Sequence, residues 1–319
     1  MKRLLLLFRL PIDLLLCVLA LPAGLILLGY RKFGSARLPH TTSLLKSIGV
    51  FPLRNHYYEP LFDHRALEKP LSDDRVLPGL DLDERGQLAL LDRLDRADEL
   101  RALQLDQPSA DPLRFRFHNG HFESGDAEFL YQFLRATRPA RVIEIGCGNS
   151  TRIAKLALDA NRAETGQHTS HVCIEPYEMP WLEAIGVQVI RQKVEDCDLD
   201  WANELQAGDL LFIDSSHVIR PQGDVLHEYL RILPLLRSGV NVHVHDIFTP
   251  RDYPAEWVVD QVRFWNEQYL LEALLSNSTR YEIVAGLNYL QHHHHEALKR
   301  VCPYLDRARE PGSFYFRVR

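Results

Sequence analysis

Side chains able to move a proton or bind a metal ion follow two short apolar runs in the second half of the chain. Asp214 and His217 come after the run at 209–213, and His245 and Asp246 come directly after the run at 240–244. If both runs are neighbouring parallel strands, these side chains meet at one sheet edge, where adjacent strands lie about 4.8 Å apart. Carboxylate and imidazole groups placed in this way can accept a proton or hold a divalent cation.

Two arrangements of these residues remain open. In the first, Asp214 and Asp246, together with His245, bind a divalent cation such as Mg²⁺ or Mn²⁺, which lowers the pKa of a bound hydroxyl group. Imidazole suits Mg²⁺ poorly and suits Mn²⁺ or Zn²⁺ better. In the second, no metal binds, and His217 or His245 acts as a general base that an aspartate orients.

A glycine turn follows another apolar run, at 141–145. The turn reads Gly-Cys-Gly-Asn-Ser-Thr, and Glu144 lies just before it. Gly146 and Gly148 allow the backbone to turn sharply and to approach a ligand closely. A dinucleotide-binding turn has a third glycine that seats a pyrophosphate on the following helix, but Thr151 stands in that place here. The negative charge of Glu144 also disfavours a pyrophosphate and favours a cationic ligand.

A second acid, Glu175, ends the apolar run at 171–174. A carboxylate in this position can accept hydrogen bonds from both hydroxyls of a ribose. Its separation from Gly146 exceeds the roughly 20 residues typical of dinucleotide-binding folds, and the polar stretch at 161–170 explains the difference as a longer loop.

Helical and extended patterns alternate around these residues. We expect helices at 126–136, 151–158, 225–236 and 257–275, and strands at 141–145, 171–174, 187–190, 209–213, 240–244, 281–285 and 313–318. Such alternation predicts an α/β fold, a doubly wound and mainly parallel sheet with helices on both faces. Ligands of such folds bind beyond the carboxyl ends of the strands.

The N-terminal part of the chain has a different composition. Residues 14–30 carry no charge and basic residues flank them, which indicates a membrane segment near the short limit for spanning. Pro22 and Gly24 lie in its middle, and a helix broken there could enter one leaflet and turn back. A simple single-pass anchor is an equally open alternative. We therefore divide the chain into a membrane anchor or re-entrant segment at 1–30, a linker with an amphipathic helix (81–103) at 31–112, and a catalytic domain at 113–319. The aromatic-rich segment 56–60 is a docking loop or simply linker packing.

Charge and cysteine content exclude some functions. The chain has 319 residues and a net charge of −6, which disfavours a nucleic-acid partner. Five cysteines form no Cys-x-x-Cys pair, so their spacing argues against disulfides and a zinc site and favours a reduced compartment. The run of four histidines at 292–295 lacks a matching cysteine or acid and is expected to be solvated.

The turn with its preceding acid resembles motif I of class I S-adenosylmethionine (SAM)-dependent methyltransferases. The segments at 212–217, 244–248, 252–254, 265–269 and 312–316 are similar to a Methyltransf_24-like subgroup that O-methylates small molecules and sugars. The resemblance covers about residues 114–319 and implies the Rossmann-like, seven-stranded methyltransferase sheet. It implies that SAM is bound by two acids, the turn and the segment after the third strand, namely Glu144, Gly146, Cys147, Gly148, Asn149, Ser150, Thr151, Glu175, Val194 and Glu195. Cation-dependent O-methyltransferases place acids at the same strand ends as Asp214 and Asp246, usually with Asp-Asp or Asp-Asn where this chain has His-Asp.

The function implied is O-methylation of a hydroxyl on a sugar, a glycolipid or another small, glycan or lipid-linked acceptor at the membrane. The domain is expected in the cytoplasm, where SAM is made. Two alternatives remain. A nicotinamide-dependent oxidoreductase would want the third glycine and a Tyr-x-x-x-Lys pair, and a non-catalytic membrane-attached binding protein would not need the acids. The sequence leaves the oligomeric state open.

Overall fold

The computed structural model describes residues 2–55, 58–177 and 179–319, so His56 and Tyr57 of the aromatic-rich segment lie outside the described residues. The chain divides into two compact units, Met1–Pro70 and Leu71–Arg319. The regular elements described in the first unit are helices, and the second unit contains the whole sheet. The expected division at residues 30 and 112 stays a prediction.

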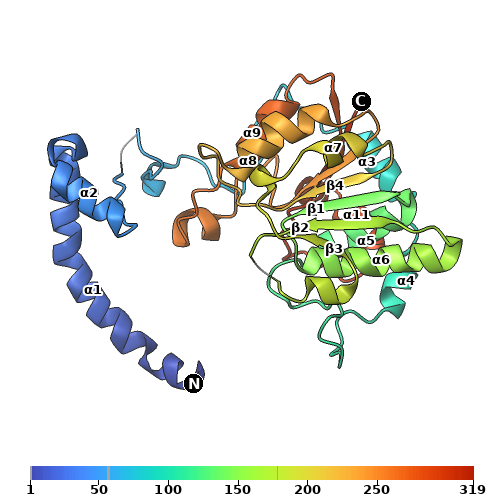
Figure 1. The fold of residues 1–319 in the computed structure, drawn as a ribbon, viewed down its shortest axis with the longest axis horizontal. Coiled ribbons are helices and arrows are strands. Elements are labelled where there is room, and N and C mark those ends of the chain that lie inside the picture. Colours follow the sequence, from blue (N-terminus) through green and yellow to red (C-terminus); the bar gives the residue numbers. More distant parts are fainter. Residues whose placement is uncertain (1, 56–57, 178) are drawn as a thin grey trace. The chain divides into compact units, whose positions relative to one another are not determined.

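The first unit begins with one long helix. Helix α1 (Lys2–Phe33) continues through Pro11 and Pro22, and Figure 1 shows it as a curved blue ribbon. The expected break at Pro22 and Gly24 is therefore not seen. Within α1, the segment Arg9–Phe33 has 25 residues and a mean hydropathy of 2.4, and its most apolar stretch is not buried inside the protein. The segment is therefore long and apolar enough to cross a membrane.

Short helices follow α1 where the prolines predicted irregular structure. Helix α2 (Pro39–Ser47) has its proline at the first helical position, where the missing N–H costs nothing. The Tyr30 hydroxyl lies 2.6 Å from the Thr42 hydroxyl and ties α2 to the end of α1. The turns η1 (Ser35–Arg37) and η2 (His64–Ala66) complete the helical segments of this unit.

The second unit is built on a seven-stranded sheet in the order β3-β2-β1-β4-β5-β7-β6 (Figure 1). The strands are β1 (Arg141–Ile145), β2 (Ser170–Ile174), β3 (Gln188–Ile190), β4 (Leu210–Ile213), β5 (Asn241–Val244), β6 (Tyr281–Gly286) and β7 (Phe314–Val318). Strands β1 to β5 are parallel, and β7 runs antiparallel between β5 and β6. This arrangement confirms the predicted α/β class. Because Ile145 pairs with Ile213 and Ile213 pairs with Val244, the turn after β1 lies beside Asp214 and His245.

Apolar side chains from helices cover both faces of the sheet. One face is packed by α5 (Asp126–Thr137), α6 (Asn149–Thr165), α10 (Leu287–His293) and α11 (His295–Val301), with α3 (Glu84–Leu91) and α4 (Ala97–Ala102) beyond them. The other face is packed by α7 (Asp200–Glu204), by α8 (Asp224–His227), which continues as η5 (Glu228–Ile232) and η6 (Leu233–Leu235), and by α9 (Glu267–Leu275). Turns η3 (Leu182–Ile185), η4 (Val194–Asp196) and η7 (Glu256–Asp260) lie in loops.

Two predicted long helices are wrong in extent. The helix expected at 81–103 is two short helices, α3 and α4, because the chain turns between them and the backbone N–H of Arg96 donates to Gln132 Oε1 at 2.8 Å. The helix expected at 257–275 begins only at Glu267, because Val262 has a left-handed φ of 52° that a helix cannot continue through.

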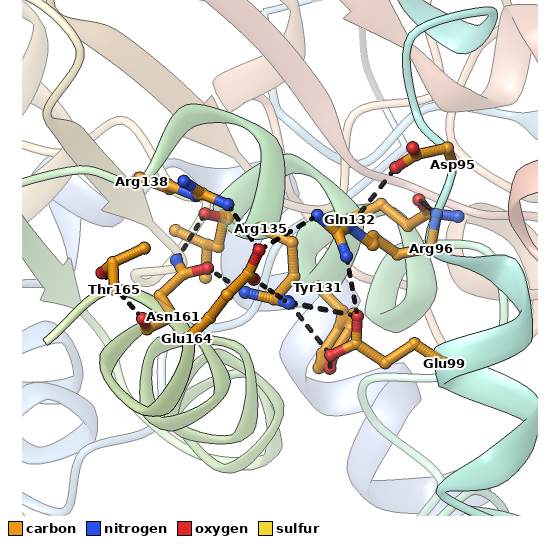
Figure 2. A network of polar contacts seen from close by, with 11 residues as sticks. Asp95, Arg96, Glu99, Tyr131, Gln132, Arg135, Arg138, Asn161, Glu164 and Thr165 are labelled. Atoms are coloured by element: carbon orange, nitrogen blue, oxygen red, sulfur yellow. Dashed lines mark hydrogen bonds and ion pairs between the residues drawn. The ribbon is translucent and has the colours of Figure 1, made fainter. Parts of the chain in front are cut away.

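A polar network fastens α4 to the helices that cover the sheet (Figure 2). Its centre is Arg135 on α5, which is almost fully buried. Its guanidinium bonds Glu99 of α4 at 3.1 Å and Glu164 of α6 at 2.7 Å, and it also donates to Asn161. Tyr131 donates a further hydrogen bond of 2.5 Å to Glu99. The segment before the sheet is thereby part of the second unit.

Candidate active site

A cleft of about 960 Å³ opens at the carboxyl ends of β1, β2, β4 and β5, where a doubly wound fold binds its ligands. Most residues expected to bind the cofactor line it, namely Gly146, Cys147, Gly148, Asn149, Ser150, Glu175, Val194 and Glu195. The structure also brings Asp214, His217, His245 and Asp246 to the same cleft. One cavity therefore joins the expected ligand turn to the expected catalytic residues.

The two glycines of the turn have different roles. Gly146 has a φ of 76°, and a Cβ built on it would lie 1.8 Å from the backbone oxygen of Asp214. Only glycine therefore allows β1 to turn against β4 at this point. Gly148 is extended, with a φ of 179°, and a Cβ there would have ordinary contact with Met179 at 3.7 Å. Its missing side chain leaves room on the cleft side of the turn.

Glu144 and Thr151 lie beneath the turn, outside the residues that line the cleft. Glu144 is only 1% exposed. The Thr151 hydroxyl donates to Glu144 Oε2 at 2.5 Å and accepts from the backbone N–H of Gly148 at 3.1 Å. These two residues thus hold the turn from below, which is a different position from the direct cofactor contact that the sequence suggests.

Glu175 connects the loop after β2 to the turn after β1. Its carboxylate accepts a hydrogen bond from the backbone N–H of Tyr177 at 2.9 Å and one from Cys147 at 3.4 Å. The side chain is largely buried and borders the cleft. Backbone donors fix the carboxylate at the place where a ribose is expected.

Two aspartates and two histidines form one cluster at the ends of β4 and β5. Asp214 Oδ1 lies 3.3 Å from His217 Nε2 and 3.4 Å from His245 Nδ1. Asp246 approaches the same nitrogens at 3.5 and 3.6 Å. Ligand atoms of Asp214, His217 and Asp246 all lie within 4.8 Å of one another, so His217 joins the two acids that the sequence pairs with His245 for a metal.

Burial and charge act in opposite directions in this cluster. Burial alone raises the pKa of Asp214, but His245 and His217 outweigh it and hold that pKa well below its usual range. For Asp246 burial prevails, and its pKa is raised. Burial alone lowers the pKa of each histidine, but the neighbouring carboxylates outweigh it and raise both. Asp214 therefore keeps its negative charge to a lower pH than Asp246 does.

Sequence reasoning assigned no role to Glu267, which is fully buried at the start of α9. Its Oε2 lies 2.8 Å from His217 Nδ1, so that His217 Nε2 faces the two aspartates. The one sequence feature that points to Glu267 is its position in the segment 265–269, which is similar to the methyltransferase subgroup. His217 and Asp246 also have left-handed φ values of 59° and 57°, the kind of backbone strain that gathers at functional sites.

An aromatic wall closes the cleft beside this cluster. The Arg263 guanidinium lies 4.5 Å from the ring centre of Trp257 and 4.4 Å from that of Trp265. The Trp265 ring in turn lies 4.4 Å from the ring of His217. Glu256 and Gln261 add polar groups to the same part of the cleft. The Arg263 guanidinium thus stacks on both indole rings, and polar and aromatic groups lie side by side in this part of the cleft.

Comparison with known proteins finds a matching family model and a relative. Residues 143–247 match a family model described as a methyltransferase domain. An uncharacterized protein of Archaeoglobus fulgidus is 29% identical over 193 residues, which cover 55% of this chain and 83% of that protein.

Solved structures are similar at low sequence identity. An O-methyltransferase from Bacillus cereus in complex with SAH has 13% identity and a TM-score of 0.34, over 73% of this chain and 91% of that one. The plantazolicin methyltransferase BpumL with SAH has 12% identity and a TM-score of 0.34, over 75% and 96%. MycE methyltransferase from the mycinamycin biosynthetic pathway, with Mg and SAH, has 14% identity and a TM-score of 0.35, over 73% and 54%.

Proposed function

We propose that this chain, a class I SAM-dependent methyltransferase, methylates a hydroxyl group of a sugar, glycolipid or other small acceptor at a membrane. Its sequence matches a methyltransferase domain, and its fold is the expected seven-stranded, mainly parallel sheet. The observation that carries the proposal is the shared cleft. It places the ligand turn and Glu175 on one side and the aspartate–histidine cluster on the other.

SAM binding is assigned to the turn and to Glu175. The backbone at Gly146 and Gly148 gives the methionine end a close approach, and Glu175 accepts hydrogen bonds from the ribose hydroxyls. Val194 and Glu195 are the first two residues of the turn η4, and both border the cleft where adenine is expected. Glu144 and Thr151 support the turn without lining the cleft.

Replacing Glu175 by Ala is expected to weaken SAM binding by about 1.5–3 kcal/mol, the value of a hydrogen bond to a charged group, or roughly 10- to 150-fold in Kd. Calorimetric titration with SAM measures the change, and a parallel titration with NAD(H) tests the oxidoreductase alternative. Asp196→Ala is the control, because Asp196 is an exposed acid of η4 that does not line the cleft. A folded Glu175→Ala protein that binds SAM like the parent would remove Glu175 from the site.

The aspartate–histidine cluster is assigned to the acceptor. In methyl transfer the acceptor oxygen forms a bond to the methyl carbon as the carbon–sulfur bond breaks, and the hydroxyl proton must leave. His217 is held by Glu267, so its Nε2 and the two aspartates point to one spot where a hydroxyl can be oriented and deprotonated.

The same residues fit a divalent cation. Asp214, His217 and Asp246 offer two carboxylates and one imidazole at mutual distances that a single ion can bridge. When bound, such a cation lowers the pKa of the hydroxyl. His245, in contact with both aspartates, is the further group that completes or orients the set.

The aromatic wall favours a sugar-like acceptor. Sugar rings carry apolar C–H faces and a rim of hydroxyls, and Trp257 and Trp265 with Glu256, Gln261 and Arg263 offer the complementary surfaces.

The direct test is transfer of label from methyl-labelled SAM to fractionated cell-envelope extract. We expect one labelled acceptor that carries a new base-stable methyl ether. The transfer of label should stop when EDTA is present and resume when Mn²⁺ or Mg²⁺ is added. Full activity in EDTA would assign the proton to a histidine base instead. No labelled product from any fraction, despite tight SAM binding, would favour the non-catalytic binding protein.

Membrane attachment is assigned to α1, with the catalytic domain in the cytoplasm. Removal of residues 1–33 is expected to move the protein from the membrane fraction to the soluble fraction without changing its Kd for SAM, because the cleft is formed entirely by residues of the second unit. Fractionation followed by titration measures both. A shortened protein that stays in the membrane fraction would contradict the assignment.

A further inference from the structure

A second group of ligand-type side chains lies beneath the cofactor turn. Glu144 on β1 pairs directly with Cys173 on β2, and His171 precedes Cys173 by two residues. Side chains two apart on a strand share a face, and residues in register on neighbouring strands do so as well. The result is one oxygen, one nitrogen and one sulfur atom within 4.8 Å of one another.

All three side chains are buried, yet their polar atoms are poorly satisfied. Glu144, His171 and Cys173 are 1%, 7% and 0% exposed. Among the residues that the structure describes, Glu144 Oε1 and both ring nitrogens of His171 make no hydrogen bond, although Oε1 lies 3.3 Å from Nε2. Buried polar atoms almost always have partners, so this group points to a ligand that completes it.

The group is also held in a fixed orientation. The Thr151 hydroxyl occupies Glu144 Oε2, which leaves Oε1 directed toward His171. The thiol of Cys147, in the cofactor turn, lies against Cys173. An outer partner that fixes one carboxylate oxygen and leaves the other to bind is a common feature of metal sites.

We propose that Glu144, His171 and Cys173 bind a Zn²⁺ ion beneath the cofactor turn. Thiolate, imidazole and carboxylate are the ligands of Zn²⁺, at about 2.3, 2.0 and 2.0 Å from the metal. Tetrahedral bonds of this length put the ligand atoms about 3.3–3.8 Å apart, so small side-chain movements close the site. Binding displaces the thiol proton of Cys173.

The site has an approach from the surface. A separate depression of about 260 Å³ is lined by Ser170, His171 and Gln188, with Asp159 at its edge. A metal ion can thus reach His171 without passing through the active-site cleft. Spacing along the chain gave no zinc motif, because the ligands come from two strands that the fold places side by side.

Such an ion would support cofactor binding indirectly. Glu144 stands two residues before Gly146, and Cys173 stands two residues before Glu175. The ion therefore links the two loops that form the cofactor half of the cleft. The metal measurement itself does not depend on methyl transfer.

The test uses the full chain in detergent, loaded with Co²⁺ as a spectroscopic substitute for Zn²⁺. We expect an intense near-ultraviolet thiolate-to-cobalt absorption, displaced by one equivalent of Zn²⁺. Cys173→Ala is expected to abolish this absorption and His171→Gln to weaken cobalt binding at least tenfold. Cys302→Ala, which removes another fully buried thiol, is the matched control and should change nothing.

The double variant Asp214→Asn, Asp246→Asn separates this site from the cleft cluster, and the thiolate absorption should persist in it. If the folded parent protein shows no thiolate absorption with Co²⁺, or if Cys173→Ala retains it, the proposal is wrong. Where Cys173→Ala fails to fold, a parent protein that shows no such absorption still contradicts the proposal, because the absorption requires a sulfur ligand.

Discussion

Replacing Asp214 by Asn is expected to lower kcat by about 10²- to 10⁴-fold, the usual contribution of a positioned acid or base, while the Kd for SAM stays near that of the parent. The pKa of Asp214 is held well below its usual range, and one of its carboxylate oxygens faces both His217 and His245. Asparagine keeps the shape and removes the charge. Acceptor methylation at saturating SAM measures kcat, and calorimetry measures the Kd.

Asp260→Asn is the control for this variant, since Asp260 is an exposed acid of η7 outside the cluster. If Asp214→Asn keeps full kcat, the cluster does not act on the acceptor, whether through a cation or through a histidine. If it loses SAM binding as well, its main role is to shape the turn at Gly146.

Replacing Gly146 by Ala is expected to remove SAM binding and to lower the Tm. The left-handed φ of 76° costs an alanine about 1–3 kcal/mol, and the new methyl group would overlap the backbone oxygen of Asp214. Strain of that size alone corresponds to about 5- to 150-fold in an equilibrium constant, and the overlap adds to it. Calorimetry with SAM and thermal unfolding measure the two effects.

Gly148→Ala is the matched comparison. Its φ of 179° suits any residue, and its nearest contact would be an ordinary 3.7 Å, so the Tm should stay near that of the parent. Equal Tm values for the two variants would show that the approach of β1 to β4 is less tight than the structure has it.

The sheet was predictable because its strands are short, mainly apolar runs, and Glu175, Asp214 and Asp246 each come at or just after the end of such a run. The order of the strands then brought these three residues to one edge without further assumptions. The placement of the glycine turn and Glu175 in one cleft was predictable for the same reason, since each follows directly from a strand end.

What sequence patterns missed depends on distant contacts. Glu267 reaches His217 from a helix fifty residues later in the chain, and no spacing rule connects them. Glu144 sits directly before the glycines, but whether its carboxylate faces the cleft or the interior is decided by Thr151 and His171. The helix expected at 257–275 begins only at Glu267 because of the left-handed backbone at Val262, which the apolar periodicity of the segment does not reveal.

The ion network around Arg135 has a consequence for how the molecule comes apart. Its two acidic partners are Glu99 on α4, which precedes the first strand in the chain, and Glu164 on α6, which connects β1 to β2. If either helix detached, the buried guanidinium would lose one of these two carboxylates. Removing one partner from a buried ion group is costly. Leu91 and Leu100 of the same segment belong to the core that covers the sheet. Residues from Leu71 onward should therefore unfold in one cooperative transition. Residues 143–247, which match the family model, should not fold by themselves, because they lack helices and strands that complete this unit.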